Sequence, residues 1–165
     1  MLERWLGWQP SDRAALVELA FALKIGENHL RDMMDWLEEI ALRDQAQIHQ
    51  VLGRKVIGDI TTDPRLGRAD KLKRVKERVR RWRFPRLAET EDAIRGKIQA
   101  LKLHPGVRLS VPPGLEGGRL QVEFTAASHE ELKQLTAKLS EALEKTVVAE
   151  IFEFLSGARP EKDRK

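Results

Sequence analysis

The stretch 106–143 reads GVRLSVPPGLEGGRLQVEFTAASHEELKQLTAKLSEAL, and it decides the fold class because its hydrophobic period changes within it. Apolar and polar residues alternate over 107–111 and again over 120–124, a pattern typical of two β-strands. The spacer between them is rich in proline and glycine, and it permits a hairpin as well as pairing with a second subunit. Ser128 then begins a helix, with Glu131 three residues later as in a capping box, and a stripe of leucines follows.

The remainder of the sequence has the three- and four-residue apolar spacing of amphipathic helices. Helices are predicted over about 12–23, from Leu30 to Ala41, and over 45–52, 69–84 and 87–101. Ser11 and Asp12 are N-cap candidates for the first helix, and Met33 and Met34 are predicted to lie in the core. Breakers over 59–67 predict a connector, and Pro85 is expected to end the helix before it.

We therefore expect a mainly α fold with a small β element. Its predicted parts are a helical region over 1–103 with a basic helix in the middle of the chain, a strand-strand-helix module over 104–157, and a polar tail over 158–165. The order of the elements predicts that the helical region comes first and the module last.

Composition excludes several classes of protein. The chain has no cysteine, which excludes disulfides, thiol catalysis and cysteine-ligated metal sites and favours a reducing compartment. No apolar run reaches the length of about 18 residues that a membrane-spanning helix needs, and the N-terminal segment lacks the apolar stretch of a signal peptide. We expect a cytoplasmic protein that does not insert into membranes.

Charge is distributed unevenly along the chain. Residues 1–53 carry a net charge of −4, residues 54–102 carry +9 and residues 103–165 carry −1. The densest positive run lies in the predicted helix 69–84, where only Asp70 and Glu77 oppose it, and such a cluster is a candidate for phosphate binding. A solvated helix face is the alternative reading, and Trp82 and Phe84 within this segment either stack on bases or anchor the helix. The candidate DNA-binding residues are Lys71, Arg74, Arg78, Arg80, Arg81, Arg83 and Arg86.

Catalytic and metal-binding motifs are missing from the sequence. The four histidines do not have metal-ligand spacing, and no phosphate-binding loop, nucleophile elbow or kinase signature occurs. We expect a protein that is not an enzyme and that has no cofactor and no metal site.

Residues 19–37, LAFALKIGENHLRDMMDWL, resemble the helix-turn-helix of ParB-type chromosome and plasmid partition proteins. Ala20 stands at the small-residue position and Ile25 and Leu30 at apolar positions, whereas Lys24 occupies the turn position usually taken by glycine. The strands and leucine-rich helix of the C-terminal third are similar to the dimerisation module of the same family. No GERR-like run occurs, so the family's nucleotide-binding domain is absent from the sequence.

This resemblance implies a DNA-associated homodimer, with a partition ATPase as a possible partner class. A lone two-stranded sheet is marginally stable, which also favours completion by a second copy. The residues expected at the dimer interface are Leu120, Val122, Phe124, Leu132, Leu135 and Leu139.

The predicted second helix of the helix-turn-helix carries six acidic residues against two arginines, which opposes its approach to phosphates. We therefore expect DNA contact through the basic helix. The alternative is a protein-interaction or scaffold homodimer with a degenerate helix-turn-helix and no DNA binding.

Overall fold

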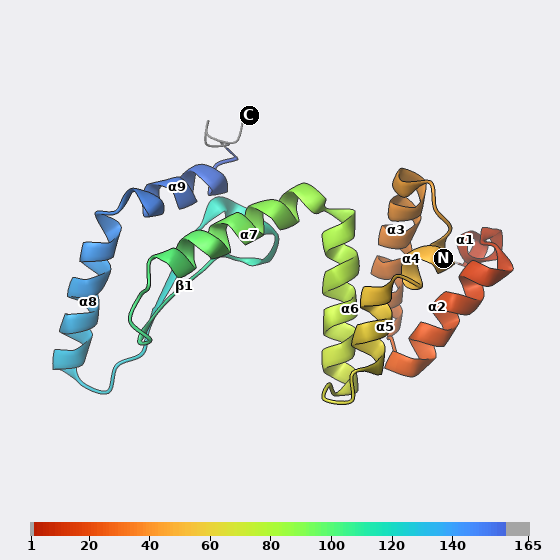
Figure 1. Cartoon of the computed structure of the whole chain (residues 1–165), viewed down its shortest axis with the longest axis horizontal. Coiled ribbons are helices and arrows are strands. Elements are labelled where there is room, and N and C mark those ends of the chain that lie inside the picture. The colour runs from red at the N-terminus through yellow and green to blue at the C-terminus, as the bar shows by residue number, and fades with distance from the viewer. Residues whose placement is uncertain (1, 158–165) are drawn as a thin grey trace. The chain divides into compact units, whose positions relative to one another are not determined.

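The computed structural model describes residues 2–157 and separates into two compact units, Met1–Pro85 and Arg86–Lys165. It is mainly helical with one small antiparallel sheet (Figure 1), as the sequence predicts. The division falls after Pro85 rather than after the predicted residue 103, because the intervening helix places Ile94 and Leu101 in the core of the second unit. The predicted polar tail over 158–165 lies outside the described residues.

The first unit is built entirely from helices in its described part. These are α1 (Leu2–Gly7), α2 (Pro10–Leu23), α3 (Glu27–Asp44), α4 (Ile48–Leu52), α5 (Lys55–Thr62) and α6 (Arg68–Arg83). Several differ from the sequence prediction: α1 and α5 were not predicted as helices, α5 extends into the predicted connector, and α3 is longer at both ends than expected. The helix α2 begins two residues early because Pro10 suits the first turn of a helix.

The core of the first unit is centred on α3, which packs against α6 and α4, while α2 packs against α4 and α6. Met33 and Met34 are buried, which confirms their predicted place in the core. The side chains that are almost completely buried here are Leu16, Met33, Met34, Leu37, Ile40, Val51, Val75 and Val79.

Asp12 has a different role from the predicted N-cap. It lies inside the first turn of α2, Gln9 takes the cap position, and the carboxylate is buried. Its Oδ1 accepts hydrogen bonds from the backbone N–H of His49 and lies 2.8 Å from His49 Nδ1. Asp12 therefore satisfies an amide in the first turn of α4 and joins two helices that are distant in sequence.

The turn between α2 and α3 has left-handed backbone geometry at Lys24, with φ 50° and ψ 56°. The Lys24 N–H donates to carbonyls of the last turn of α2, and the Ile25 N–H donates to the Ala20 carbonyl at 2.9 Å. Lys24 occupies the turn position at which a helix-turn-helix usually has glycine. The left-handed geometry there lets the backbone N–H groups satisfy the last carbonyls of the helix, whichever side chain is present. A non-glycine residue there costs about 1 kcal/mol.

The second unit combines helices with the sheet. Its elements are α7 (Pro85–Ala100), β1 (Val107–Ser110), the 3-10 segment η1 (Pro113–Gly118), β2 (Gln121–Phe124), α8 (His129–Leu143) and α9 (Thr146–Leu155). The two strands pair with each other, so the open question of hairpin or intersubunit pairing is decided in favour of a hairpin within the chain. The predicted helix start at Ser128 is also confirmed, because its side chain accepts a hydrogen bond from the Glu131 N–H at 3.1 Å.

The hairpin has one apolar and one polar face. Val107 pairs with Phe124 and Leu109 with Val122, and residues directly opposite on antiparallel strands share a face. Leu109 contributes to a core formed with buried residues of α7 and α9, namely Ile94, Leu101, Val148 and Ile151.

Two polar contacts fix this second core. Glu91 of α7 is buried and its Oε1 accepts a hydrogen bond from the Gly114 N–H of η1 at 3.1 Å. Lys97 of α7 forms an ion pair with Glu150 of α9. These contacts tie α7 to α9 and to the connection between the strands.

Within the described residues, none of the helices is both long enough and apolar enough to span a membrane.

Candidate nucleic-acid interface

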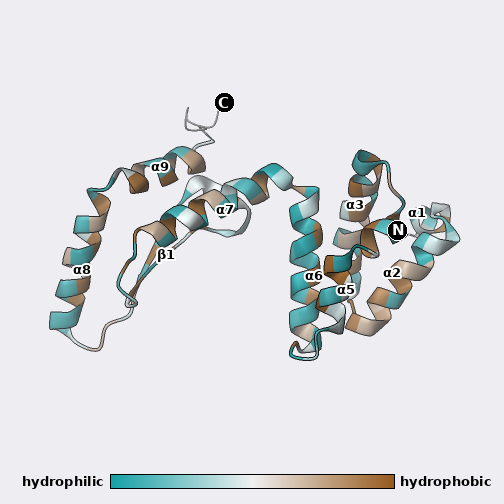
Figure 2. Cartoon of the chain, in the orientation of Figure 1, coloured by the Kyte–Doolittle hydropathy of each residue, from teal (hydrophilic) through white to brown (hydrophobic). Residues whose placement is uncertain are grey.

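The candidate interface is the helix α6, which begins after Gly67 and ends at Arg83, because Pro85 keeps Phe84 out of the helical conformation. One side of it is held in the core by Val75 and Val79, with Leu72 and Trp82 partly buried beside them. Most of the helix is hydrophilic (Figure 2), since the other positions are nearly all charged. The 3.6-residue period divides its cations into two sets, one toward α3 and one on the opposite flank.

The cations on the side toward α3 are engaged in ion pairs. Lys76 Nζ lies 3.2 Å from Asp32 Oδ2 and 2.7 Å from His29 Nδ1, and Arg83 forms an ion pair with Glu39. Arg80 pairs with Glu77 of its own helix. The acidic excess of α3 and part of the basic excess of α6 thus neutralise each other, so Arg80 and Arg83 are not the accessible phosphate contacts that their sequence position suggests.

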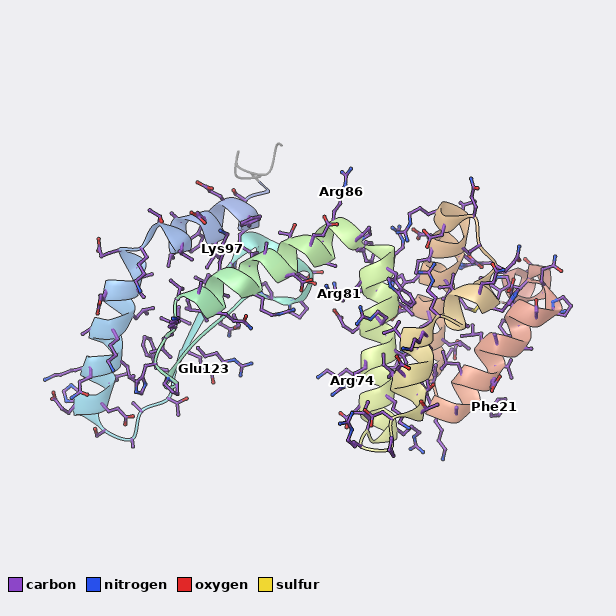
Figure 3. The ribbon with its side chains drawn as sticks, viewed as in Figure 1. Phe21, Arg74, Arg81, Arg86, Lys97 and Glu123 are labelled. Atoms are coloured by element: carbon purple, nitrogen blue, oxygen red, sulfur yellow. The ribbon has the colours of Figure 1, made fainter. Side chains whose placement is uncertain are left out.

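The opposite side of α6, which we name the outer flank, carries Lys71, Arg74, Arg78 and Arg81. Arg74 and Arg81 project from α6 away from α3 (Figure 3). Neither Arg74 nor Arg78 makes a hydrogen bond or ion pair with another residue in the described part of the chain, and neither does Lys73 beside them. Lys73 and Arg74 are exposed, whereas Arg78 is half-buried. Lys71 donates to the Thr61 carbonyl at 2.8 Å, which anchors the end of α5. The last candidate, Arg86, is exposed near the start of α7.

The aromatic residues near the end of α6 anchor the fold. Trp82 packs against the core of the first unit, and the Arg54 guanidinium lies 4.6 Å from the centre of its ring. The Trp82 carbonyl accepts a hydrogen bond from Arg43. Phe84 is partly exposed, but the Arg83 guanidinium lies 4.7 Å from its ring centre. These contacts favour the anchoring role over base stacking.

The helix α3 is held on several sides by ion pairs with other elements. Arg4 of α1 contacts both Asp35 and Glu38. Asp44, at the end of α3, contacts Arg43 and Arg54, which lower the pKa of its carboxyl. Together with the α6 contacts, these ion pairs connect α3 to α1, to α6 and to Arg54 at the start of α5.

A groove of about 670 Å³ lies between α1, the start of α2 and the end of α3. Its carboxylates are already bound: Asp12 accepts from His49, and Glu38 accepts from Arg4 and from Trp8 Nε1. Among the described residues, no group of three metal-ligating side chains is close enough to hold a metal ion. The groove therefore offers no uncommitted acid or base for chemistry.

The candidate dimer residues divide between the interior and the surface of the second unit. Leu135 is only 1% exposed and reaches the place where a side chain at Gly106 would lie, so it belongs to the chain's own packing rather than to an interface. Leu120 and Leu139 pack partly against the same core, and Phe124 is half-buried. The exposed apolar side chains of this unit are Val122 at 41%, Leu132 at 42%, Leu143 at 49% and Phe152 at 48%.

One of these exposed residues, Phe152, was not among the predicted interface positions. Leu143 belongs to the leucine stripe of α8 on which the predicted dimer rests. Phe152 follows Ile151, which is buried, and in an almost continuous apolar run only the fold decides which of two neighbours faces water.

No protein-family model, curated protein or solved structure matches the chain.

Proposed function

We propose that this chain is a non-enzymatic, ParB-like DNA-associated protein that binds phosphates through the outer flank of α6 and dimerises through its second unit. The observation that carries the proposal is the pair of guanidiniums at Arg74, which is exposed, and Arg78, which is half-buried. Neither forms a hydrogen bond or ion pair within the described residues. Hydrogen bonds from Arg65 and, as a smaller contribution, the positive charge of Arg74 lower the pKa of the nearby Asp63 carboxyl. Lysine and arginine side chains that neutralise phosphates release counterions, and this release supplies most of the free energy of sequence-independent binding.

Dimerisation supports the same function because two copies present two basic helices to one duplex. The second unit leaves apolar side chains of β2, α8 and α9 in water. Within the described residues β1 and β2 pair only with each other, so both outer edges of the two-stranded sheet have no partner strand. Sheets of two strands gain stability when further strands or a facing apolar surface are added.

The test is binding of fluorescent duplex DNA by the full chain at low salt. Replacing Arg74 and Arg78 with glutamate is expected to abolish retention while far-UV circular dichroism stays unchanged, because neither side chain contributes to an ion pair of the fold. The matched control is the double substitution Lys24→Glu with Lys133→Glu, which makes the same change in net charge at two exposed positions away from α6, one in the turn after α2 and one on α8. If both double variants lose binding equally, net charge alone explains retention and α6 is not the contact surface.

The second candidate function is a scaffold homodimer that does not bind DNA. It is favoured by Phe21, whose side chain is 80% exposed on α2 next to the exposed Val17 one turn earlier (Figure 3). An exposed aromatic with an apolar neighbour is typical of a protein-binding surface. Absence of duplex binding at low salt, with the dimer intact, would support this function.

A further inference from the structure

We infer that the chain binds duplex DNA without reading its sequence, by contacts to phosphates alone. The inference rests on the proposed function and adds the class of nucleic acid and the mode of recognition. It follows from how the polar side chains of the two candidate DNA-facing helices, α3 and α6, are used within the fold.

The helix with recognition-helix spacing, α3, has almost no polar side chain left for bases. Its nine titratable residues all form hydrogen bonds or ion pairs within the first unit. Several of the partners lie on other helices: Arg4 of α1 pairs with Asp35, and Lys76 of α6 pairs with Asp32. Asn28 is the only amide or hydroxyl side chain on the helix, and one amide reads at most one adenine.

The helix α6 carries no amide or hydroxyl side chain at all. Its outward-pointing positions include Asp70 and Glu77, which are seven residues apart and therefore on one face. The two carboxylates on that face would repel the DNA phosphates and so oppose deep insertion of the helix into a DNA groove. The cations of the outer flank beside them can still reach the phosphates that border the groove. This arrangement supplies the positioning contacts of a DNA-binding protein and omits the base contacts that give specificity.

The same helix favours double-stranded over single-stranded DNA. Binding of single strands relies on exposed aromatic rings on which bases stack. Trp82 is packed against the core with Arg54 over its ring, and Arg83 lies over the ring of Phe84, so both rings are engaged by arginines of the chain itself.

The number of available cations sets the expected salt dependence. Lys73, Arg74 and Arg78 provide about three phosphate contacts per chain, which corresponds to a slope of log K against log salt of about −2.7 per chain. Replacing Arg74 and Arg78 with alanine is expected to reduce the magnitude of that slope by about 1.8 per chain, equally for every duplex.

The experiment measures anisotropy of three unrelated 20-base-pair duplexes, together with a selection from a randomised duplex library. The length of about 20 base pairs is chosen to span two turns of B-DNA. We expect the three affinities to agree within about threefold, no consensus to emerge, and Asn28→Ala with Arg31→Ala to change nothing, since each good base contact would be worth about 1–3 kcal/mol of discrimination.

Each contrary outcome has a distinct meaning. A selected sequence that binds about 100-fold more tightly than random duplex, and loses that advantage in the Asn28→Ala, Arg31→Ala variant, would overturn the inference but leave phosphate binding by α6 intact. Tighter binding of the corresponding single strands would overturn the preference for duplex DNA. Failure of every nucleic acid to bind at 50 mM salt, a condition that favours phosphate contacts, would instead refute the proposed function itself.

Discussion

The leucine stripe of α8 offers a quantitative test of the dimer, because its members differ sharply in burial. Leu132 and Leu143 are about half exposed, whereas Leu135 is buried within its own unit. Replacing Leu132 and Leu143 with aspartate removes only the buried half of each side chain from apolar surroundings, at a cost of about 1 kcal/mol per site. A unit of this size has a stability of about 4–12 kcal/mol, so the fold should persist and the dimer should dissociate.

Leu135→Asp is expected to behave differently, contrary to the sequence-based expectation that Leu135 lies between subunits. Truncating a buried leucine to alanine costs about 3–5 kcal/mol, and an unpaired buried carboxylate adds several kcal/mol more. The sum is comparable with the whole stability of the unit, so this variant should unfold it rather than release a folded monomer.

The assay combines sedimentation velocity at micromolar concentration with thermal melts followed by circular dichroism. The Leu132→Asp, Leu143→Asp variant should sediment as a folded monomer of 18.9 kDa while the parent sediments as a dimer. Its matched control places aspartates at Gln134 and Ala137, which are exposed on the opposite side of α8 and give the same change in net charge. A parent that is already monomeric, or a double variant that remains dimeric, would refute the assignment of this surface to the dimer.

Two further substitutions test the first unit. Lys24→Gly should raise the free energy of unfolding by about 0.5–1 kcal/mol in urea titrations, because glycine adopts the left-handed turn without steric cost; a decrease would contradict the geometry of this turn. Asp12→Ala should lower that free energy by about 2 kcal/mol, since it leaves the part-buried N–H of His49, in the first turn of α4, without its acceptor, whereas Asp12→Asn should recover roughly half of the loss. Equal stability of the Asp12→Ala variant and the parent in thermal melts would show that the hydrogen bond to His49 contributes nothing.

Local features of the chain follow directly from residue order. The alternation over 107–111 and 120–124 gives strands, three- and four-residue spacing gives helices, and Pro85 separates two of them. The capping box at Ser128 depends on residues three apart. Each of these is a relation between near neighbours, and so the sequence contains all the information that is needed.

The candidate site was only partly predictable for the same reason. Composition identifies α6 as the basic helix, but it does not separate Arg74 and Arg78 from Arg83, which has Glu39 as its partner. Ion pairs between α3 and α6 join residues more than 40 positions apart, such as Lys76 and Asp32, separated by 44. Their partners are known only once the two helices are packed side by side.

What the sequence by itself determined is therefore the type of most elements, the apolar side of the helices it predicted, and the uneven distribution of charge. Only the tertiary structure decided that α7 joins the second unit, that the strands pair within one chain, and that Leu135 is buried while Leu132 on the same stripe is exposed. The physical reason is that helical periodicity fixes which face needs to be covered, but the covering surface comes from segments elsewhere in the chain. Burial and charge pairing are properties of that contact, and no local pattern contains them.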